Sequence, residues 1–342
     1  MAQSKETLKD RTAKEWARIV AKYRSPSHTR SILEIIITAV PLIGLWFAAV
    51  YSYYYSYWLS LVFIVPAAFF LVRLFAIQHD CGHGTLFRHK AMNDWVGRVL
   101  GVFTWTPYDL WRRDHAAHHS TSGNLSQRGY GDITTLTMEE YQNLNFWGKF
   151  YYRFYRAPIV LFGIGPTYLF IIRQRLPFGR FNEFRAWLSA MTTNVFIAGL
   201  VVLLLYTIGV GAFFLVHLPI VILAGTVGVW LFYVQHQFED THWTKEANWD
   251  HQSAALYGSS HYDLPFVLRW LTANIGFHHI HHLHSKIPYY RFPKIVKDHP
   301  QLGAMSRLTL WESFKCANLH LWDEANEKLI SFRERRRRLR QQ

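Results

Sequence analysis

Two long runs of the chain contain no Asp, Glu, Lys or Arg, and they restrict the possible folds more than any other feature. Residues 35–72 form the first run and residues 186–238 the second. Since one helical span takes roughly 17 to 25 residues, each run is too long for one span and long enough for two. The sequence therefore predicts two apolar helical hairpins in a membrane.

Each run offers a place to turn. The segment YSYYYSYW, residues 51–58, lies mid-run, where aromatic side chains would form a belt at the far interface. The second run is expected to turn near residues 209–211. Residues 91–110 are mixed and aromatic, which favours a place in or near the interface. Residues 157–172 are apolar but interrupted by Gly and Pro, so we interpret them as a re-entrant or interfacial element.

The distribution of charge predicts an orientation. The chain has 37 Lys and Arg against 23 Asp and Glu, a net charge of +14. Two hairpins place both termini on one side, and because that side carries the basic residues it is predicted to be cytoplasmic. Residues 1–30 are basic, without an apolar signal core, and are expected to form a helix along the membrane surface. Two cysteines exclude a disulfide framework. Without a zinc-finger pattern or a basic recognition helix, no nucleic-acid partner is expected.

Three histidine boxes follow apolar or aromatic stretches: HDCGH, HAAHH and HHIHH, with His79, His83, His115, His118, His119, His278, His281 and His282. On a helix, positions i, i+3 and i+4 share a face, so the three imidazoles of the third box are predicted to point at one spot. An isolated pair of this kind is commonly structural, but three such boxes predict metal binding. Eight ligands exceed what one ion takes, so two metals are implied, and iron, copper, zinc and nickel all suit imidazole.

These boxes, in this order around two hairpins, resemble the membrane fatty acid desaturase superfamily. The segments GVWLFYVQHQFED and YDLPFVLRWLTANIGFHHIHHLHSKIPYY resemble bacterial acyl-lipid desaturases, and the similarity runs from about residue 41 to beyond residue 322. The predicted fold class is an all-α integral membrane protein of the bacterial cytoplasmic membrane: four transmembrane helices in two hairpins, interfacial helices and a cytoplasmic helical region that carries the histidines.

The resemblance implies two iron ions without haem, O₂ as co-substrate, and introduction of a cis double bond into the acyl chain of a membrane lipid. It carries the ligand role to the eight box histidines, and His236 matches an additional histidine of the family. No catalytic residue beyond the metal centre is expected. Relatives that act on acyl-CoA have four residues between the first-box histidines and an Asn four positions before the additional histidine. Here three residues intervene and Phe232 replaces the Asn, which favours an acyl-lipid enzyme.

Other polar residues near the boxes have alternative interpretations. His279 and His284 are expected beside the metal site or on the surface, and His242, His251 and His261 in a solvated loop or near the site. Four carboxylates could orient a ligand imidazole or cap a helix: Asp80, Asp114, Glu239 and Asp240. Cys81 is expected to be a small buried residue, and His217 a structural polar residue within a span.

The whole chain, residues 1–342, is interpreted as one domain. It comprises the N-terminal segment (1–30), the first hairpin (31–76), the first two boxes with interfacial elements (77–185), the second hairpin (186–238), and a cytoplasmic region with the third box and a basic tail (239–342). No fused haem carrier is recognised, so electrons are expected from a ferredoxin, a flavodoxin or a similar acidic carrier, steered by the basic surface. The run at 333–340 could dock that carrier, hold anionic lipid or be a solvated tail.

Two alternative functions stay open. A di-iron hydroxylase or ketolase of a lipid, carotenoid or alkane would use the same ligands and yield an oxygenated product. A metal transporter or haem-bearing membrane protein would place ligands inside the spans. Here only His217 is clearly mid-span.

Overall fold

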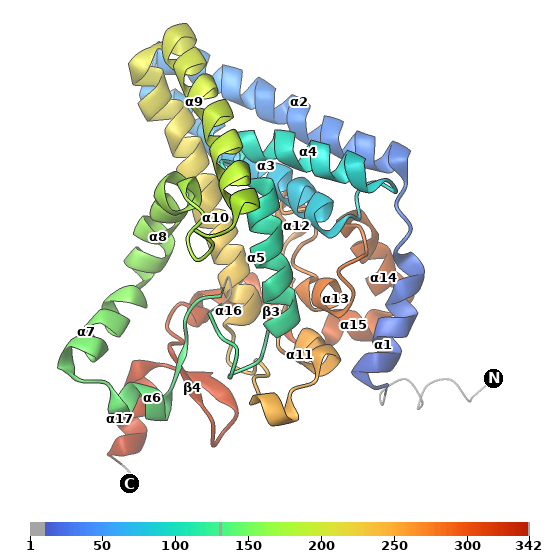
Figure 1. Cartoon of the computed structure of the whole chain (residues 1–342), viewed down its shortest axis with the longest axis vertical. Helices are drawn as coiled ribbons and strands as arrows, with labels where there is room; N and C mark the ends of the chain where they lie inside the picture. Colours follow the sequence, from blue (N-terminus) through green and yellow to red (C-terminus); the bar gives the residue numbers. More distant parts are fainter. Residues whose placement is uncertain (1–10, 130–131, 341–342) are drawn as a thin grey trace.

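The computed structural model describes residues 11–129 and 132–340 (Figure 1). The predicted basic N-terminal segment lies partly outside this range, in residues 1–10. Its described part forms α1 (Ala13–Val20), with Thr12 as a side-chain cap, and the 3₁₀ turn η1 (Ala21–Tyr23). We expected this helix to lie along a membrane surface, but Trp16 and Val20 are fully buried against the rest of the protein. The apolar face of α1 thus packs on protein, and the position of the helix relative to a membrane stays a prediction.

The first hairpin consists of α2 (His28–Tyr53) and α3 (Tyr57–His83), which pack along their length. The turn falls in the aromatic segment, as predicted, and the side chains of Tyr51, Tyr55 and Trp58 are largely exposed there. The Ser60 hydroxyl donates to the Ala49 carbonyl at 2.8 Å, which joins the two helices near the turn. The hairpin returns the chain directly to the first histidine box.

The second hairpin covers the 53 residues Phe184–His236 and contains α9 (Phe184–Ala212), the π-helical turn η5 (Phe213–His217) and α10 (Leu218–His236). It reverses at Gly209, whose φ of 75° and ψ of 165° lie in a region that glycine adopts without strain. Figure 1 shows the chain turning back between α9 and α10 near one end of the molecule. The Tyr54 hydroxyl donates to the Ile208 carbonyl at 2.6 Å, so the turns of the two hairpins are in contact.

Three helical elements of the described chain are long and apolar enough to cross a membrane: α2, α3 and Phe184–His236. A fourth candidate is the bent pair formed by α7 (Phe146–Tyr155) and residues 160–175, which meet at 56°. That second part comprises η2 (Val160–Ile164), α8 (Gly165–Thr167), η3 (Tyr168–Ile172) and η4 (Arg173–Arg175). The number of crossings stays a prediction.

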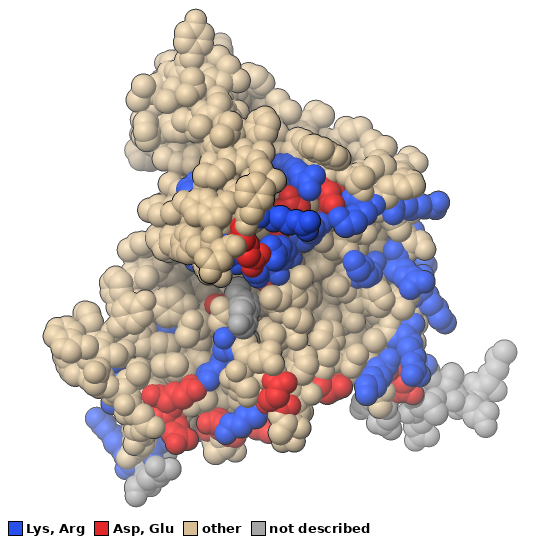
Figure 2. Space-filling model, in the orientation of Figure 1, with Lys and Arg blue, Asp and Glu red and all other residues tan. Residues whose placement is uncertain are grey.

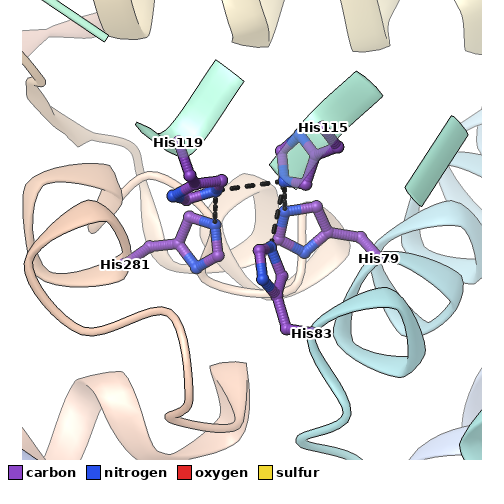
Figure 3. A group of neighbouring side chains, drawn as sticks. All are labelled: His79, His83, His115, His119 and His281. Carbon is purple, nitrogen blue, oxygen red and sulfur yellow. Dashed lines mark hydrogen bonds between the residues drawn. The ribbon is translucent and has the colours of Figure 1, made fainter. Parts of the chain in front are cut away.

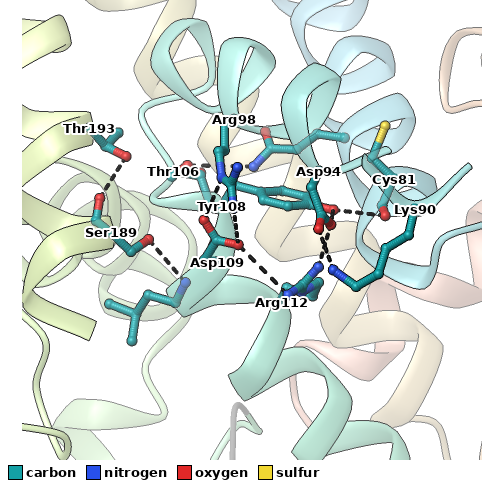
Figure 4. A network of polar contacts seen from close by, with 12 residues as sticks. Cys81, Lys90, Asp94, Arg98, Thr106, Tyr108, Asp109, Arg112, Ser189 and Thr193 are labelled. Atoms are coloured by element: carbon teal, nitrogen blue, oxygen red, sulfur yellow. Dashed lines mark hydrogen bonds and ion pairs between the residues drawn. The ribbon is translucent and has the colours of Figure 1, made fainter. Parts of the chain in front are cut away.

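Two helices lie between the hairpins, α4 (Lys90–Phe103) and α5 (Tyr108–Thr121), and α5 carries the second box. A polar network fixes them against α3 (Figure 4). The Tyr108 hydroxyl donates to the Cys81 carbonyl at 2.8 Å and lies 3.2 Å from a carboxylate oxygen of Asp94. Arg98 of α4 donates to Asp109 of α5 at 2.8 Å. These contacts set the rotation of α5 relative to the first box.

The remaining elements are short. The helices are α6 (Met138–Asn143), η6 (Glu246–Asn248), α11 (His251–Tyr257), α12 (Phe266–Leu271), α13 (His278–Leu283), η7 (Tyr289–Arg291), α14 (Phe292–Asp298), α15 (Pro300–Ala304), α16 (Leu310–Cys316) and α17 (Phe332–Leu339). The strands are β1 (Leu136–Thr137), β2 (His261–Asp263), β3 (Arg307–Thr309), β4 (Leu321–Asp323) and β5 (Lys328–Ile330). β1 pairs with β4 in parallel and β4 with β5 antiparallel, while β2 and β3 pair in parallel. The protein is therefore mostly helical, and the all-α prediction missed two small sheets.

Candidate metal centre

Four helices bring the nine predicted histidines together. The last two turns of α3 carry His79 and His83, and α5 carries the second box. His236 is the last residue of α10, and the third box forms most of α13. The segment that precedes α13 packs closely against β2 (His261–Asp263). A Cβ on Gly276 would lie 2.3 Å from the Tyr262 carbonyl oxygen, so only glycine fits there.

The histidines separate into two groups. The five-histidine group contains His79, His83, His115, His119 and His281 (Figure 3). The four-histidine group contains His118, His236, His278 and His282. In each group the candidate ligand nitrogens lie within 4.8 Å of one another.

The spacing of the nitrogens in the five-histidine group fits coordination better than hydrogen bonding. The Nε2 atom of His115 lies 2.9 Å from that of His79, 3.0 Å from that of His83 and 3.1 Å from that of His119. One imidazole nitrogen can serve as one donor or one acceptor, so it cannot satisfy three such neighbours. Ligands about 2.1 Å from a common ion and at right angles are about 3.0 Å apart. The described residues therefore fit a metal ion at this place.

The four-histidine group has the same geometry. His236 Nε2 lies 3.1 Å from His118 Nε2 and 2.9 Å from His278 Nε2. The His282 Nε2 atom is buried and has no hydrogen-bond partner among the described residues. Leaving a buried polar nitrogen unpaired is costly, and coordination would remove that cost. The two groups are thus compatible with a dimetal site.

The third box does not point at one spot, which corrects the prediction. His278 and His282 belong to the four-histidine group, whereas His281 belongs to the five-histidine group. The reason is helical geometry: consecutive residues point about 100° apart, so His281 and His282 diverge although each can share a side with His278. Their rings are perpendicular, with centroids 5.7 Å apart. The second box divides in the same way, because His118 joins the other group.

Aromatic rings pack beside both groups. The Trp111 ring stacks on His115 at 4.7 Å, and Phe232 lies 5.1 Å from the rings of both His118 and His236. A cavity of about 20 Å³ adjoins His236, and its lining includes Asp132, Phe232 and Gln237. This volume holds one water-sized ligand. The cavity leaves room for one small further ligand beside His236.

Burial keeps the imidazoles neutral. It lowers the pKa of His115, His119, His278, His281 and His282 well below the usual range, with neighbouring histidines adding to the effect. These side chains are therefore unprotonated at neutral pH and have a lone pair available for a metal.

The carboxylate that approaches a ligand histidine was not among those predicted. Oδ1 of Asp132 lies 2.6 Å from Nδ1 of His118. Asp80 comes only within 3.7 Å of His79 Nδ1 and accepts the backbone N–H of Tyr289 instead. Asp114 pairs with Arg180, Glu239 pairs with Lys328, and Asp240 is exposed. The one sequence signal for Asp132 is an acid in a glycine-containing segment soon after the second box.

The other histidines lie outside the two groups. His279 is fully buried and its Nε2 lies 2.8 Å from the Leu302 carbonyl oxygen, so it belongs to the core. His261 is also buried, in β2, with Nδ1 2.6 Å from the Gly303 carbonyl oxygen, which corrects its expected place in a solvated loop. His242, His251 and His284 are partly exposed. Nδ1 of His217 accepts the indole N–H of Trp46 at 3.3 Å, in keeping with a structural role. Cys81 is buried as expected.

Long apolar helices that end at a cluster of nine imidazoles, seven of them buried, are typical of a membrane-associated protein with a histidine-ligated metal site. The fatty acid desaturase family model matches residues 56–314, which is most of the chain. A fatty acid desaturase of Bacillus subtilis is 41% identical over 324 residues, covering 94% of this chain and 91% of the relative. The chain therefore belongs to the fatty acid desaturase family.

More distant relatives have more specific names. An sn-1 acyl-lipid omega-3 desaturase (ferredoxin) of Synechocystis is 26% identical, covering 84% of this chain and 81% of the relative. An sn-1 oleoyl-lipid 12-desaturase of Anabaena variabilis is 24% identical, covering 78% of this chain and 74% of the relative. The chain is similar to these proteins over most of its length.

Proposed function

We propose that this protein introduces a cis double bond into the acyl chain of a membrane lipid, at a non-haem di-iron centre held by nine histidines. The observation that carries the proposal is the convergence of nine imidazoles, seven buried and two partly exposed, in groups of five and four at the ends of apolar hairpins. Membership of the fatty acid desaturase family supports the reaction class.

The five-histidine group would hold one iron ion and the four-histidine group the other. Removing hydrogen from an unactivated methylene is beyond side-chain acids and bases, and two iron ions with O₂ and two electrons supply the oxidising power when bound. The protein contributes neutral ligands and ring orientations fixed by packing. No other catalytic side chain is required. The bond position would depend on how far an apolar tunnel between the hairpins and residues 157–172 admits the chain.

A lipid-bound acyl chain is the proposed substrate form. Two sequence features support it: three residues between His79 and His83, and Phe232 four positions before His236. Phe232 packs on two imidazoles of the four-histidine group, so no amide side chain approaches that group from this position. The acyl-lipid names of the cyanobacterial relatives agree with this choice.

The charge distribution supports an orientation and a type of electron donor. In Figure 2 the tips of the hairpins carry no charged side chains, whereas Lys and Arg, interspersed with Asp and Glu, appear over the rest of this face. By the positive-inside bias, that part and both termini would face the cytoplasm of a bacterial cell. An acidic carrier such as ferredoxin or flavodoxin would be attracted there, and a relative is named for ferredoxin. Turnover should then slow as ionic strength rises, and a rate indifferent to salt would count against this donor type.

The test of the function is the fatty acid profile of a bacterial host, by gas chromatography with localisation of double bonds. The host expresses the parent chain, His281→Ala, or His284→Ala as a control from outside both groups. A new cis-unsaturated acid with the parent and the control, and none with His281→Ala, is the expected result. Hydroxylated lipid in its place would favour a hydroxylase, and an unchanged profile with a well-expressed chain and a compatible donor would overturn the proposal.

A further inference from the structure

Arg156, the residue that follows α7, is a fully buried cation close to the segments around Asp132 and His236. It has no carboxylate partner among the described residues. Burying a charge is costly unless it is paired or fully hydrogen-bonded. Its planar guanidinium offers five N–H donors in a fixed arrangement. The way these donors are used indicates what the residue is for.

Neutral oxygen atoms from three chain segments surround the guanidinium. One terminal nitrogen donates to the Thr134 carbonyl at 3.1 Å and to the Thr135 hydroxyl at 2.9 Å. The other lies 3.1 Å from the Tyr233 hydroxyl and from Gln237 Oε1, and 2.7 Å from the Leu319 carbonyl. Only Nε lacks a partner among the described residues. One side chain thus joins residues 132–135, the last turn of α10 and the segment before β4.

Two of these segments support ligands of the same group. Tyr233 and Gln237 bracket His236 at the end of α10. Thr134 and Thr135 closely follow Asp132, which contacts His118. Thr135 Oγ1 also lies 3.0 Å from Gln237 Oε1, so the two segments contact each other directly. The Nε2 atoms of His118 and His236 are 3.1 Å apart, a separation that depends on both supports.

We propose that Arg156 is a positioning residue for the four-histidine group. It holds two segments in fixed relative positions: the end of α10, which carries His236, and residues 132–135, which contact His118 through Asp132. It touches neither a metal ligand nor a substrate in the described contacts, so it acts through the side chains of Gln237, Tyr233 and Thr135 and through the backbone carbonyl of Thr134. The inference rests on the proposed metal centre. It adds that the two metal sites depend on different parts of the protein. Loss of the Arg156 contacts, here called the clamp, should lower the metal affinity of the four-histidine group and leave that of the five-histidine group unchanged.

The chain offers a matched pair of variants for the test. Thr135→Val removes a buried hydroxyl from the clamp and keeps the side-chain shape. Thr134→Val makes the same change at the preceding residue, whose side chain is exposed and whose backbone carbonyl stays in place. Arg156→Lys is the third variant, since an ammonium keeps the charge but cannot form the planar set of contacts.

The measurement is anaerobic titration of the metal-free, full-length protein in detergent with ferrous ion alone, with the melting temperature recorded in parallel. The parent and Thr134→Val should bind two ions per chain. In Thr135→Val and Arg156→Lys one ion should bind about 10- to 100-fold more weakly, the range typical when a partner that orients a metal ligand is lost, while the other keeps its affinity.

The outcomes separate this inference from the proposed function. A parent chain that binds no ion overturns the metal centre itself. If the parent binds two ions and the clamp variants bind both as tightly, Arg156 has no positioning role. Equal weakening of both sites, or the same loss in Thr134→Val, would show general loosening of the fold and would also overturn the inference.

Discussion

Oδ1 of Asp132 lies 2.6 Å from Nδ1 of His118, and the Nε2 atom of the same ring faces His236. Burial opposes the carboxylate charge, but the attraction and hydrogen bond of His118 outweigh it, so the pKa of Asp132 is lowered. An ionised Asp132 at this distance stabilises the tautomer of His118 that carries its proton on Nδ1, which leaves the Nε2 lone pair free. This is the arrangement that fixes the tautomer and orientation of a metal-bound histidine.

Replacement of Asp132 should therefore weaken metal binding at the four-histidine group. We expect Asp132→Ala to lower the affinity of one of two ferrous ions by about 10- to 100-fold, because His118 loses the group that orients it. Asp114→Ala is the control, since Asp114 adjoins His115 in sequence but pairs with Arg180 at 3.0 Å. Ion titration of the metal-free variants measures the effect. Equal affinities in the Asp132 variant and the parent would remove this role.

The sequence was sufficient to place the hairpins and to select the nine histidines. Runs without charge fix where helices can cross a membrane, and Gly209 and the tyrosine-rich turn lie where the predicted reversals were placed. Eight histidines could be selected because each box follows an apolar or aromatic stretch, whereas His236 was selected from the resemblance to the family. These are local patterns, which can be recognised without knowledge of tertiary contacts.

The division into groups of five and four was not predictable in the same way. It depends on the rotation of α5 and α13 about their axes, which contacts such as that between Tyr108 and Cys81 determine. Asp132 lies in an irregular segment, where sequence distance says little about position in space. The strands have two or three residues each, too few for an alternating pattern to be recognised.

Loss of one histidine should affect the groups separately. His83 belongs to the five-histidine group and His278 to the four-histidine group. We expect His83→Ala and His278→Ala each to retain about one tightly bound ion per chain and to lose desaturation, because both metals are needed to activate O₂ in the proposed reaction. Metal analysis of the purified variants provides the count. If either single change released both ions, the sites would not be independent.

A buried ion pair should contribute strongly to stability. Glu34 of α2 and Arg73 of α3 are each about 1% exposed and pair with each other. Arg73 also donates to Thr38 at 3.0 Å, and the Tyr289 hydroxyl donates to Glu34 at 2.9 Å. Breaking such a pair leaves a charge uncompensated, so Glu34→Gln should cost about 3–5 kcal/mol.

The exposed pair of Glu239 and Lys328, 3.3 Å apart, provides the comparison for this prediction. Glu239→Gln should change the free energy of unfolding by about 1 kcal/mol or less, because water screens the pair. Thermal unfolding in detergent measures both variants. A melting temperature of Glu34→Gln as high as that of Glu239→Gln would contradict the buried pair's contribution.

Stability should fall in mild acid, and His320 should account for part of the fall. Burial, together with the positive charges of Arg156 and Arg153, lowers the pKa of His320 to about 3, and its ring stacks on Phe332 at 4.3 Å. A histidine in the unfolded chain has a pKa of about 6.5. Below pH 6.5 the unfolded state therefore binds a proton at His320 that the folded state does not bind. The free energy of unfolding therefore decreases as pH falls between about 6.5 and 3, by about 1.4 kcal/mol per pH unit for this residue.

The variant His320→Asn removes this proton uptake. Between about pH 7.5 and pH 5.5 the parent should lose about 1.4 kcal/mol more than the variant, although the variant starts from a lower stability because a ring is lost from the stack. Unfolding curves at both pH values give the loss of stability of each protein. The loss in the parent is then compared with the loss in the variant. Parallel losses in parent and variant would mean that His320 takes up its proton in the folded state as readily as in the unfolded chain.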